Sequence, residues 1–235
     1  MIILHVTDLH FNQRWYDWLS DRAPAHDVLV LSGDLLDLAN ATPAARQAAW
    51  VSDWAQSIGT PMCVCSGNHD LEWDSALERW RPALWLRDLA GPTRWIDGQA
   101  GTIGGLRFLS IGCATRPKGG EADVWVVHAP PIGVLTGRRI GGRDGGDPEL
   151  AARVARFAPQ IVCSGHVHDP THWCARSGGT LYLNPGHTAD ALVPNHILID
   201  TEQMHARGVM GCRVAETVAG PTARELATPA AAVPG

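Results

Sequence analysis

Short apolar runs alternate with helical stretches in the first part of the chain, and this order constrains the fold most strongly. The apolar runs are Ile2–Val6, Val28–Leu31 and Met62–Cys65. Each is followed by polar residues or glycine, as buried strands are. Between them, Trp15–Asp21 and Pro43–Ile58 are predicted as helices. Thr42 is the expected N-cap of the second helix, with Pro43 at its first helical position. This β-α-β-α-β order predicts a parallel sheet with right-handed crossovers.

The second half of the chain contains closely spaced strand candidates. They are Thr93–Trp95, Thr102–Ile103, Arg107–Ile111, Trp125–His128, Ile161–Cys163, Thr180–Leu183 and His196–Ile199. The clearest helix here is Pro148–Phe157, with Asp147 as its N-cap. Two sheets packed face to face, with helices outside, accommodate both halves. The sequence therefore predicts an α/β fold, a four-layer α-β-β-α sandwich of two mixed sheets.

The predicted domain covers residues 1–215, and an Ala/Pro-rich C-terminal tail covers residues 216–235. The formal net charge of −5 gives no general attraction to nucleic acid or anionic membranes. No apolar stretch approaches the roughly 20 residues that cross a bilayer, and the N-terminus lacks the pattern of a signal peptide. The six cysteines follow no zinc-ribbon spacing. We expect a cytoplasmic protein without a membrane partner, for which nucleic acid is not the expected substrate.

Five polar clusters follow strand-like runs. They are Asp8-Leu9-His10, Gly33-Asp34-Leu35-Leu36-Asp37, Gly67-Asn68-His69-Asp70, His128 before Ala129-Pro130-Pro131, and Gly165-His166-Val167-His168. Ligands of open α/β sheets bind outside the carboxyl ends of the strands, so the topology would bring these clusters together. Carboxylate, imidazole and amide ligands suit Mn, Fe, Zn or Ni. We expect the glycines before Asp34, Asn68 and His166 to form the tight turns that aim these side chains.

One such cluster alone is more often a surface turn than a metal site. All five in order, each at the end of a strand, favour a metal centre. The ordered pattern resembles the calcineurin-like metallophosphoesterase family, whose signature is D-x-H, G-D-x-x-D, G-N-H-D/E, H and G-H-x-H. Every signature position is present, between residues 8 and 168. The same motifs serve nucleases, cyclic-nucleotide phosphodiesterases, protein phosphatases and nucleotide hydrolases, so the motifs alone do not name a substrate.

The resemblance implies two adjacent divalent or trivalent transition metal ions. The implied ligands of the first ion are Asp8, His10, Asp34 and His168, and those of the second are Asp34, Asn68, His128 and His166. The Asp34 carboxylate would bridge the ions, and a hydroxide bound to both would be the nucleophile. His69, which this scheme does not need as a ligand, would protonate the leaving oxygen. Asp37 resembles the carboxylate that orients this histidine, the alternative being a plain carboxylate at a helix N-terminus.

Features outside the signature bear on the substrate. Arg138, Arg139 and Arg143 lie in a glycine-rich loop that either contacts the substrate or is simply solvated. His187 follows Asn184-Pro185-Gly186 and either touches the substrate or has a structural role in a turn. The tryptophans at positions 73, 80 and 85 are expected in the core or in a homodimer contact rather than in a base-stacking surface.

The function that we expect is hydrolysis of a small phosphate ester. A phosphodiester, such as a cyclic nucleotide or a small nucleotide-like diester, is preferred because the short intervals between the motifs hold no large cap domain. The alternatives are a phosphomonoesterase or nuclease of the same family, or a non-catalytic scaffold of this fold. The scaffold is disfavoured because it has no chemical reason to retain His69 beside a full set of ligands.

Overall fold

The computed structural model describes residues 1–115, 117–211 and 213–216; apart from Glu216, the predicted tail lies outside them. The α-helices are α1 (Gln13–Arg22), α2 (Ala44–Ser57) and α3 (Pro148–Phe157), and the short 3₁₀ helices are η1 (Ala23–Ala25), η2 (Leu84–Leu89) and η3 (Leu135–Gly137). None of the helices in these residues is long and apolar enough to cross a membrane.

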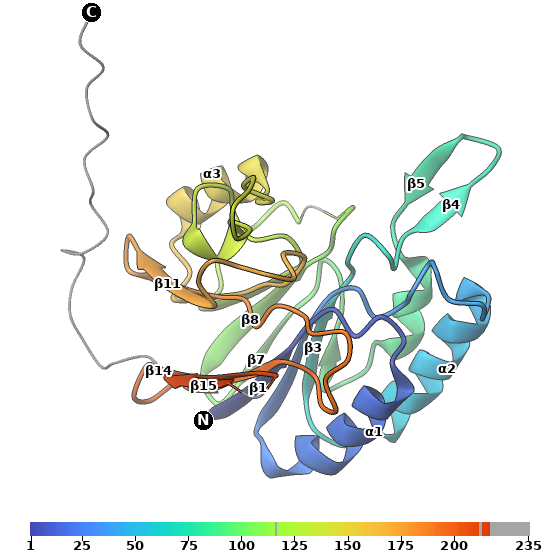
Figure 1. Ribbon diagram of the computed structural model, residues 1–235, viewed down its shortest axis with the longest axis horizontal. Helices are drawn as coiled ribbons and strands as arrows, with labels where there is room; N and C mark the ends of the chain where they lie inside the picture. The colour runs from blue at the N-terminus through green and yellow to red at the C-terminus, as the bar shows by residue number, and fades with distance from the viewer. Residues whose placement is uncertain (116, 212, 217–235) are drawn as a thin grey trace, which may run out of the picture.

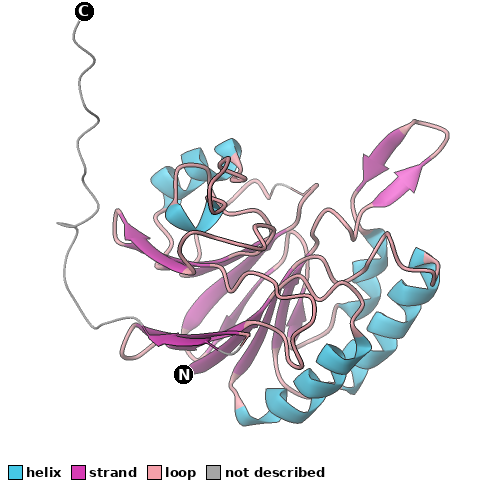
Figure 2. Ribbon diagram, in the orientation of Figure 1, coloured by secondary structure: helices cyan, strands magenta, loops and turns pink. Residues whose placement is uncertain are grey.

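The strands form two large sheets and one hairpin (Figure 2). In spatial order, the seven-stranded sheet contains β15 (Arg213–Glu216), β14 (His205–Met210), β13 (His196–Asp200), β1 (Ile2–Val6), β2 (Val28–Ser32), β3 (Met62–Cys65) and β6 (Arg94–Trp95). The six-stranded sheet contains β11 (Cys174–Ser177), β12 (Thr180–Leu183), β10 (Ile161–Cys163), β9 (Val124–Val127), β8 (Leu106–Ile111) and β7 (Ala100–Ile103). β4 (Glu72–Asp74) and β5 (Arg79–Arg81) form the hairpin.

Both large sheets are mixed. β1, β2 and β3 pair in parallel, as the alternation of strands and helices predicts, and β13 joins β1 in the antiparallel direction. In the other sheet β8, β9, β10 and β12 are parallel, while β7 and β11 are antiparallel edges. The carboxyl ends of β1, β2 and β3 and of β9 and β10 carry the polar clusters described above.

Three apolar clusters separate the layers of the molecule. Side chains alternate between the two faces of a strand, so on β1 Leu4 packs under α1 and α2 with Trp15, whereas Ile3 packs between the sheets with Phe108. The third cluster joins the outer face of the six-stranded sheet to α3, for example through Trp125. The order helices, sheet, sheet, helix confirms the predicted four-layer sandwich (Figure 1).

The two predicted helix caps have different outcomes. Asp147 caps α3, because its carboxylate accepts hydrogen bonds from the backbone of Glu149 at 2.8 Å and of Leu150 at 3.2 Å. At α2 the prediction was wrong: Pro43 occupies the N-cap position with an extended ψ of 140°, and no side chain caps the helix. The carbonyl of Thr42 instead accepts a hydrogen bond from the Gln47 side chain at 2.6 Å.

The hairpin β4–β5 was not predicted, and it projects from the body of the molecule (Figure 1). It exposes 53% of Trp73 and 49% of Trp80, so the core placement that the sequence suggested was wrong for both. Trp85 is partly buried and packs against the core beneath α2. Trp73 and Trp80 are more exposed than Trp85 because they pair across a two-stranded ribbon that belongs to neither large sheet.

Candidate metal centre

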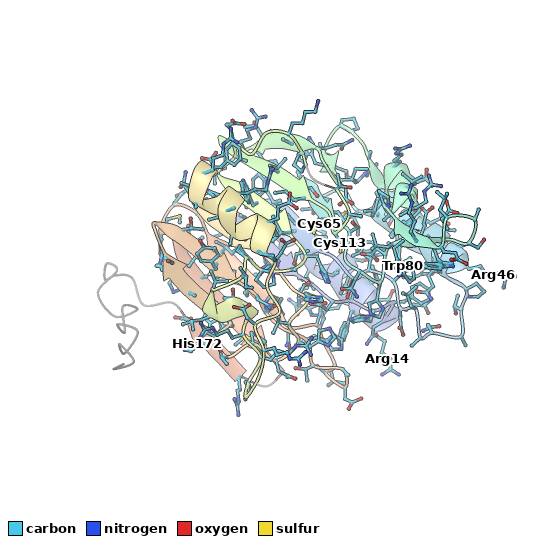
Figure 3. The ribbon with its side chains drawn as sticks, turned by 90° about the horizontal axis from the view of Figure 1, so that it is seen from above. Arg14, Arg46, Cys65, Trp80, Cys113 and His172 are labelled. Carbon is cyan, nitrogen blue, oxygen red and sulfur yellow. The ribbon has the colours of Figure 1, made fainter. Side chains whose placement is uncertain are left out.

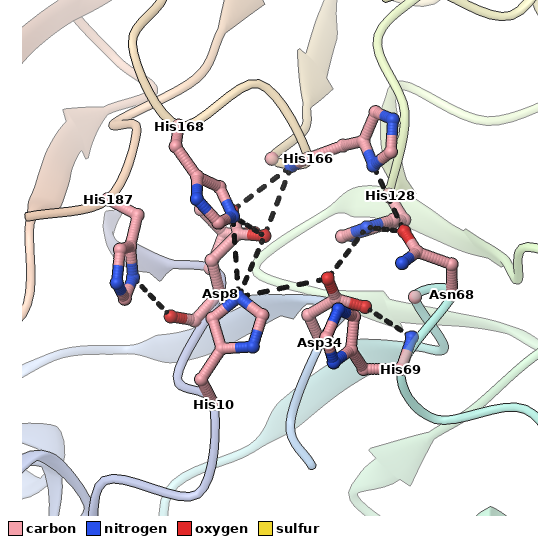
Figure 4. A network of polar contacts seen from close by, with 12 residues as sticks. Asp8, His10, Asp34, Asn68, His69, His128, His166, His168 and His187 are labelled. Carbon is pink, nitrogen blue, oxygen red and sulfur yellow. Dashed lines mark hydrogen bonds and ion pairs between the residues drawn. The ribbon is translucent and has the colours of Figure 1, made fainter. Parts of the chain in front are cut away.

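The predicted metal ligands converge at one end of the sandwich, where strands of both sheets finish (Figure 4). Asp8 and His10 follow β1, Asp34 follows β2, Asn68 follows β3, His128 follows β9, and His166 and His168 follow β10. The strands themselves are held by the apolar layer between the sheets. The cluster therefore rests on rigid elements of both sheets.

One half of the cluster combines Asp8, His10 and His168. The Nε2 atoms of His10 and His168 are 3.3 Å apart, and Nε2 of His168 lies 3.5 Å from Oδ1 of Asp8. Nε2 of His10 lies 4.0 Å from the same Asp8 oxygen. One carboxylate oxygen and two imidazole nitrogens thus face a common point, as the ligands of one cation do.

The other half combines Asn68, His128 and His166. The side-chain oxygen Oδ1 of Asn68 lies 3.0 Å from Nε2 of His128 and 3.0 Å from Nδ1 of His166. An amide oxygen flanked by two imidazole nitrogens is a second set of ligand atoms suited to a borderline divalent ion.

Asp34 lies between the two halves. Its Oδ2 is 3.9 Å from Nε2 of His10 in the first half and 3.4 Å from Nε2 of His128 in the second. Its Oδ1 accepts a hydrogen bond from the backbone of His69 at 2.8 Å. A single carboxylate oxygen thus faces both halves, which is the geometry that a bridging ligand requires.

The electrostatics of the cluster favour bound cations. Asp8 and Asp34 are buried, and within the described residues only histidines form ion pairs with them. Burial alone would raise the pKa of Asp34, but the charge and hydrogen bond of His128 hold it below its ordinary value. Burial likewise opposes a charged His128, yet Asp34 raises the pKa of that ring to about 9. The carboxylate, imidazole and amide ligand atoms fit metal ions. A bound ion would displace the extra proton that Asp34 favours on the His128 ring.

Neighbouring backbone groups orient the ligands. Nδ1 of His128 donates to the carbonyl of Ser32 at 2.9 Å, which leaves Nε2 as the nitrogen that faces the cluster. The backbone N–H of His166 donates to Oδ2 of Asp8 at 3.0 Å. Burial lowers the pKa of His10 to about 4, so this ring is neutral near pH 7, as a metal ligand must be.

Several ligands have left-handed backbone conformations. The φ angles are +52° at Asp8, +42° at His10, +51° at Asp34 and +66° at His166. Positive φ is uncommon outside glycine and tends to concentrate at functional sites, where the surrounding structure holds it. The sharp turns at these strand ends therefore lie largely in the ligands themselves.

The glycines of the motifs have two different roles. Gly33 has a φ of +92°, as the tight-turn expectation requires. Gly67 and Gly165 do not have positive φ, and for them that expectation was wrong. A Cβ at Gly67 would collide with Oδ1 of Asp34, and one at Gly165 would lie 2.6 Å from Oδ2 of Asp8. These two glycines let the backbone approach the buried carboxylates closely.

Replacing Gly67 with Ala is expected to displace the Asp34 carboxylate, because backbone and side-chain atoms of Asp34 leave no room for a methyl group. We expect a loss of about 1–3 kcal/mol in the free energy of unfolding, as for other overpacked sites, together with weaker metal binding. Urea denaturation and metal analysis measure the two effects. The control is Gly59→Ala, where a Cβ meets nothing within 4 Å; equal losses in both variants would contradict the close-approach role.

His69 lies beside the first half of the cluster. Its ring centroid is 4.7 Å from that of His10, and its Nδ1 accepts a 3.4 Å hydrogen bond from the backbone of Leu38. In the neutral ring the proton is therefore on Nε2. With His10 and Asp34, His69 also forms a group whose ligand atoms all lie within 4.8 Å of one another, so a role as a metal ligand has to be tested against a role as a proton donor.

The carboxylate of Asp37 makes no hydrogen bond to His69 in the described part of the chain. Its Oδ1 accepts from the backbone of Ala39 at 2.9 Å, an Asx-type turn. The contact to His69 comes from the next residue, Leu38, through its amide. Any orientation of His69 by Asp37 would thus act through the turn rather than through a direct contact.

Asp70 is a structural residue that we did not single out from the sequence. It is buried, and its Oδ1 accepts from the backbone of Leu35 and Leu36 at 2.9 Å each, while Oδ2 accepts from that of Gly67 at 2.8 Å. Burial and the neighbouring Asp34 raise its pKa to about 7. Asp70 joins the loop after β2 to the loop after β3; its only sequence signal was its place at the end of Gly67-Asn68-His69-Asp70.

The structure separates the predicted substrate-binding residues. Arg139 lines a cavity of about 430 Å³ together with His168. Arg138 and Arg143 are exposed and do not line it. His187 lies against the cluster: its Nδ1 donates to the carbonyl of Asp8 at 2.8 Å, and its ring centroid is 4.7 Å from that of His168.

The chain is similar to known proteins in sequence and in fold. A family model described as calcineurin-like phosphoesterase matches residues 1–170. A probable cyclic nucleotide phosphodiesterase of Synechococcus sp. is 28% identical over 172 residues, 64% of this chain, and the chain spans 60% of that relative's length.

Solved structures share the fold at low identity. A novel archaeal phosphodiesterase has 16% identity and a TM-score of 0.53, with 89% of this chain and 99% of the other covered. A purple acid phosphatase from yellow lupin seeds has 12% identity and a TM-score of 0.57, with 90% of this chain and 51% of the other covered.

Proposed function

Because the chain belongs to the calcineurin-like phosphoesterase family, we propose that this hydrolase cleaves a phosphodiester at a centre for two metal ions. The proposed diester is a cyclic nucleotide or a small nucleotide-like diester. The observation that carries the proposal is Oδ2 of Asp34, which faces ligand atoms of both halves at 3.4 and 3.9 Å. The name of the Synechococcus relative, a probable cyclic nucleotide phosphodiesterase, supports a diester over a monoester.

The proposed ligands are those that converge in Figure 4: Asp8, His10, Asp34 and His168 for one ion, and Asp34, Asn68, His128 and His166 for the other. When bound, two such ions supply Lewis-acid activation of water and neutralise charge on the phosphoryl oxygens. The mixture of carboxylate, imidazole and amide ligands keeps Mn, Fe, Zn and Ni as candidates.

His69 is proposed as the acid that protonates the leaving oxygen. The acid form is the imidazolium, which carries protons on both ring nitrogens and gives the Nε2 proton to the leaving oxygen. The Leu38 amide donates at 3.4 Å to an unprotonated Nδ1, so this long contact is lost when the ring is protonated. Nothing in this role requires His69 to move, because the ring already lies beside His10 and Asp34.

The decisive test is turnover of a substrate panel by protein reconstituted separately with Mn, Fe, Zn or Ni. The panel contains cyclic nucleotides, linear nucleotide-like diesters and the corresponding monoesters. We expect higher kcat/KM on diesters. A preference for monoesters would replace the diester proposal with the phosphomonoesterase alternative, and no turnover with any metal would favour the scaffold alternative.

Arg139 is expected to contribute to substrate binding, because it lines the cavity next to His168. Replacing Arg139 with Ala should lower kcat/KM about 10-fold to 100-fold, the usual worth of a hydrogen bond to a charged group, mainly through KM. Steady-state kinetics measure the effect. Arg143→Ala is the control, since Arg143 lies in the same loop but outside the cavity; equal losses would contradict the distinction.

A further inference from the structure

An apolar groove of about 570 Å³ runs between α2 and the hairpin β4–β5. Its main lining residues are Leu38, Ala45, Ala48, Trp73, Trp80 and Trp85. The volume lies within the range of sites for small molecules. Trp80 lies at the same end of the molecule as Arg46 of α2 (Figure 3).

The hairpin presents its aromatic side chains in a defined way. Trp73 and Trp80 are directly opposite each other in the register, and their rings are T-shaped with centroids 5.2 Å apart. An ion pair between Arg81 and Asp74 at 3.0 Å supports the ribbon. A two-stranded ribbon of this kind is only marginally stable on its own. About half of each tryptophan is nevertheless exposed rather than packed against the rest of the molecule. The exposed indole surface is available to a ligand in the groove.

The groove borders the loops that carry the candidate metal centre. Leu38 lines the groove, and its backbone N–H contacts Nδ1 of His69. Trp85 also lines the groove, and its Nε1 donates at 3.0 Å to the carbonyl of Asp70, the residue next to His69. The groove therefore lies next to His69, the proposed acid.

The charge of the groove restricts what it can bind. Neither Lys nor Arg is among the described residues that line it, whereas Glu72 and Asp88 are. A second phosphate would find no cation here, so an anionic leaving group is disfavoured. Apolar alanines on one wall and indole rings on the other suit a flat uncharged ring, which stacks on aromatic side chains.

We propose that this groove binds a flat, uncharged aromatic ring on the leaving-group side of the substrate, such as the base of a nucleoside. The inference rests on the proposed function, because it assumes that His69 faces the leaving group. It narrows the substrate class to diesters whose leaving group carries such a ring.

The test compares kcat/KM on two diesters in the metal-reconstituted full chain. In a dinucleoside 3′,5′-monophosphate the leaving group is a nucleoside, whereas glycerophosphoethanolamine carries only small polar alcohols; ³¹P NMR follows both reactions. The ratio to follow is kcat/KM on the dinucleoside monophosphate divided by kcat/KM on glycerophosphoethanolamine. For Trp80→Ala we expect this ratio to fall roughly 10-fold to 100-fold, the usual worth of one base stacked on an aromatic side chain.

Two further variants make the comparison specific. Ala45→Phe fills the groove from the exposed side of α2 without touching the hairpin, and it should lower the same ratio. Leu77→Ala is the matched control: Leu77 is in the turn of the same hairpin and is 54% exposed, but it does not line the groove. It should leave the ratio unchanged.

Binding of adenosine gives a readout that does not depend on catalysis. Ring-current shifts of the adenine protons in ¹H NMR should appear with the wild-type protein and shrink with Trp80→Ala and Ala45→Phe, but not with Leu77→Ala. If the wild type hydrolyses neither diester, the proposed function fails, and the adenosine shifts alone decide whether the groove binds the ring.

Three outcomes would overturn the proposal. One is an equal loss on both diesters, which would give the tryptophans a structural role only. Another is no change of the ratio in either groove variant. The third is a wild-type protein that sediments as a dimer and becomes a monomer with Trp80→Ala while the ratio stays unchanged, which would assign the hairpin to a contact between copies of the chain.

Discussion

Replacing Asp34 with Asn is expected to abolish hydrolysis of activated and unactivated esters alike, by a factor on the order of 10⁴ or more. The estimate follows because the ions that generate the nucleophile at neutral pH would no longer share a charged ligand. Asn retains the volume of the side chain, tolerates the φ of +51°, and keeps an oxygen for the backbone N–H of His69. The change thus removes the negative charge and replaces Oδ2, the oxygen that faces both halves, with an amide NH2 that cannot ligate a cation.

Metal analysis and kinetics on both esters, with circular dichroism to confirm folding, measure this effect. Metal content should fall together with activity, since Oδ2 of Asp34 faces both halves of the centre. A variant that kept two ions and lost rate on only one class of ester would show that Asp34 is not the bridge.

Replacing His69 with Ala is expected to lower hydrolysis of an ester with a poor leaving group by about 10²-fold to 10⁴-fold, the usual worth of a positioned acid. A nitrophenyl diester needs little protonation of its leaving group, so its loss should be smaller. Metal content should survive, because the substitution removes none of the proposed metal ligands. The readouts are kcat/KM on both esters and the metal content of the purified variant.

The control for the His69 variant is His172→Ala, which removes an exposed histidine outside the cluster (Figure 3) and should change neither quantity. Equal losses on both esters with metal retained would assign His69 to positioning the phosphate or water. Loss of metal would make His69 a ligand, as its place in a group with His10 and Asp34 permits.

The sequence determined the framework of the fold because buried strands leave a local record. The apolar runs at Ile2–Val6 and Met62–Cys65 are strands with those same bounds, since a strand covered on both faces is mostly apolar. His5 is the exception in these two strands, and it is buried. The ribbon β4–β5 left no comparable record. Its tryptophans are as apolar as core residues, and only the absence of a layer over the hairpin exposes them.

The sequence alone also determined which residue types stand at the strand ends, and so the chemistry available to the site. Only the tertiary structure decided how they meet: His10 and His168 are 158 positions apart, yet their Nε2 atoms are 3.3 Å apart. The choice of Arg139 over its neighbours and the role of Gly67 were decided in the same way. Each depends on contacts between segments distant in the chain, and local patterns of propensity and hydrophobicity do not encode such distances.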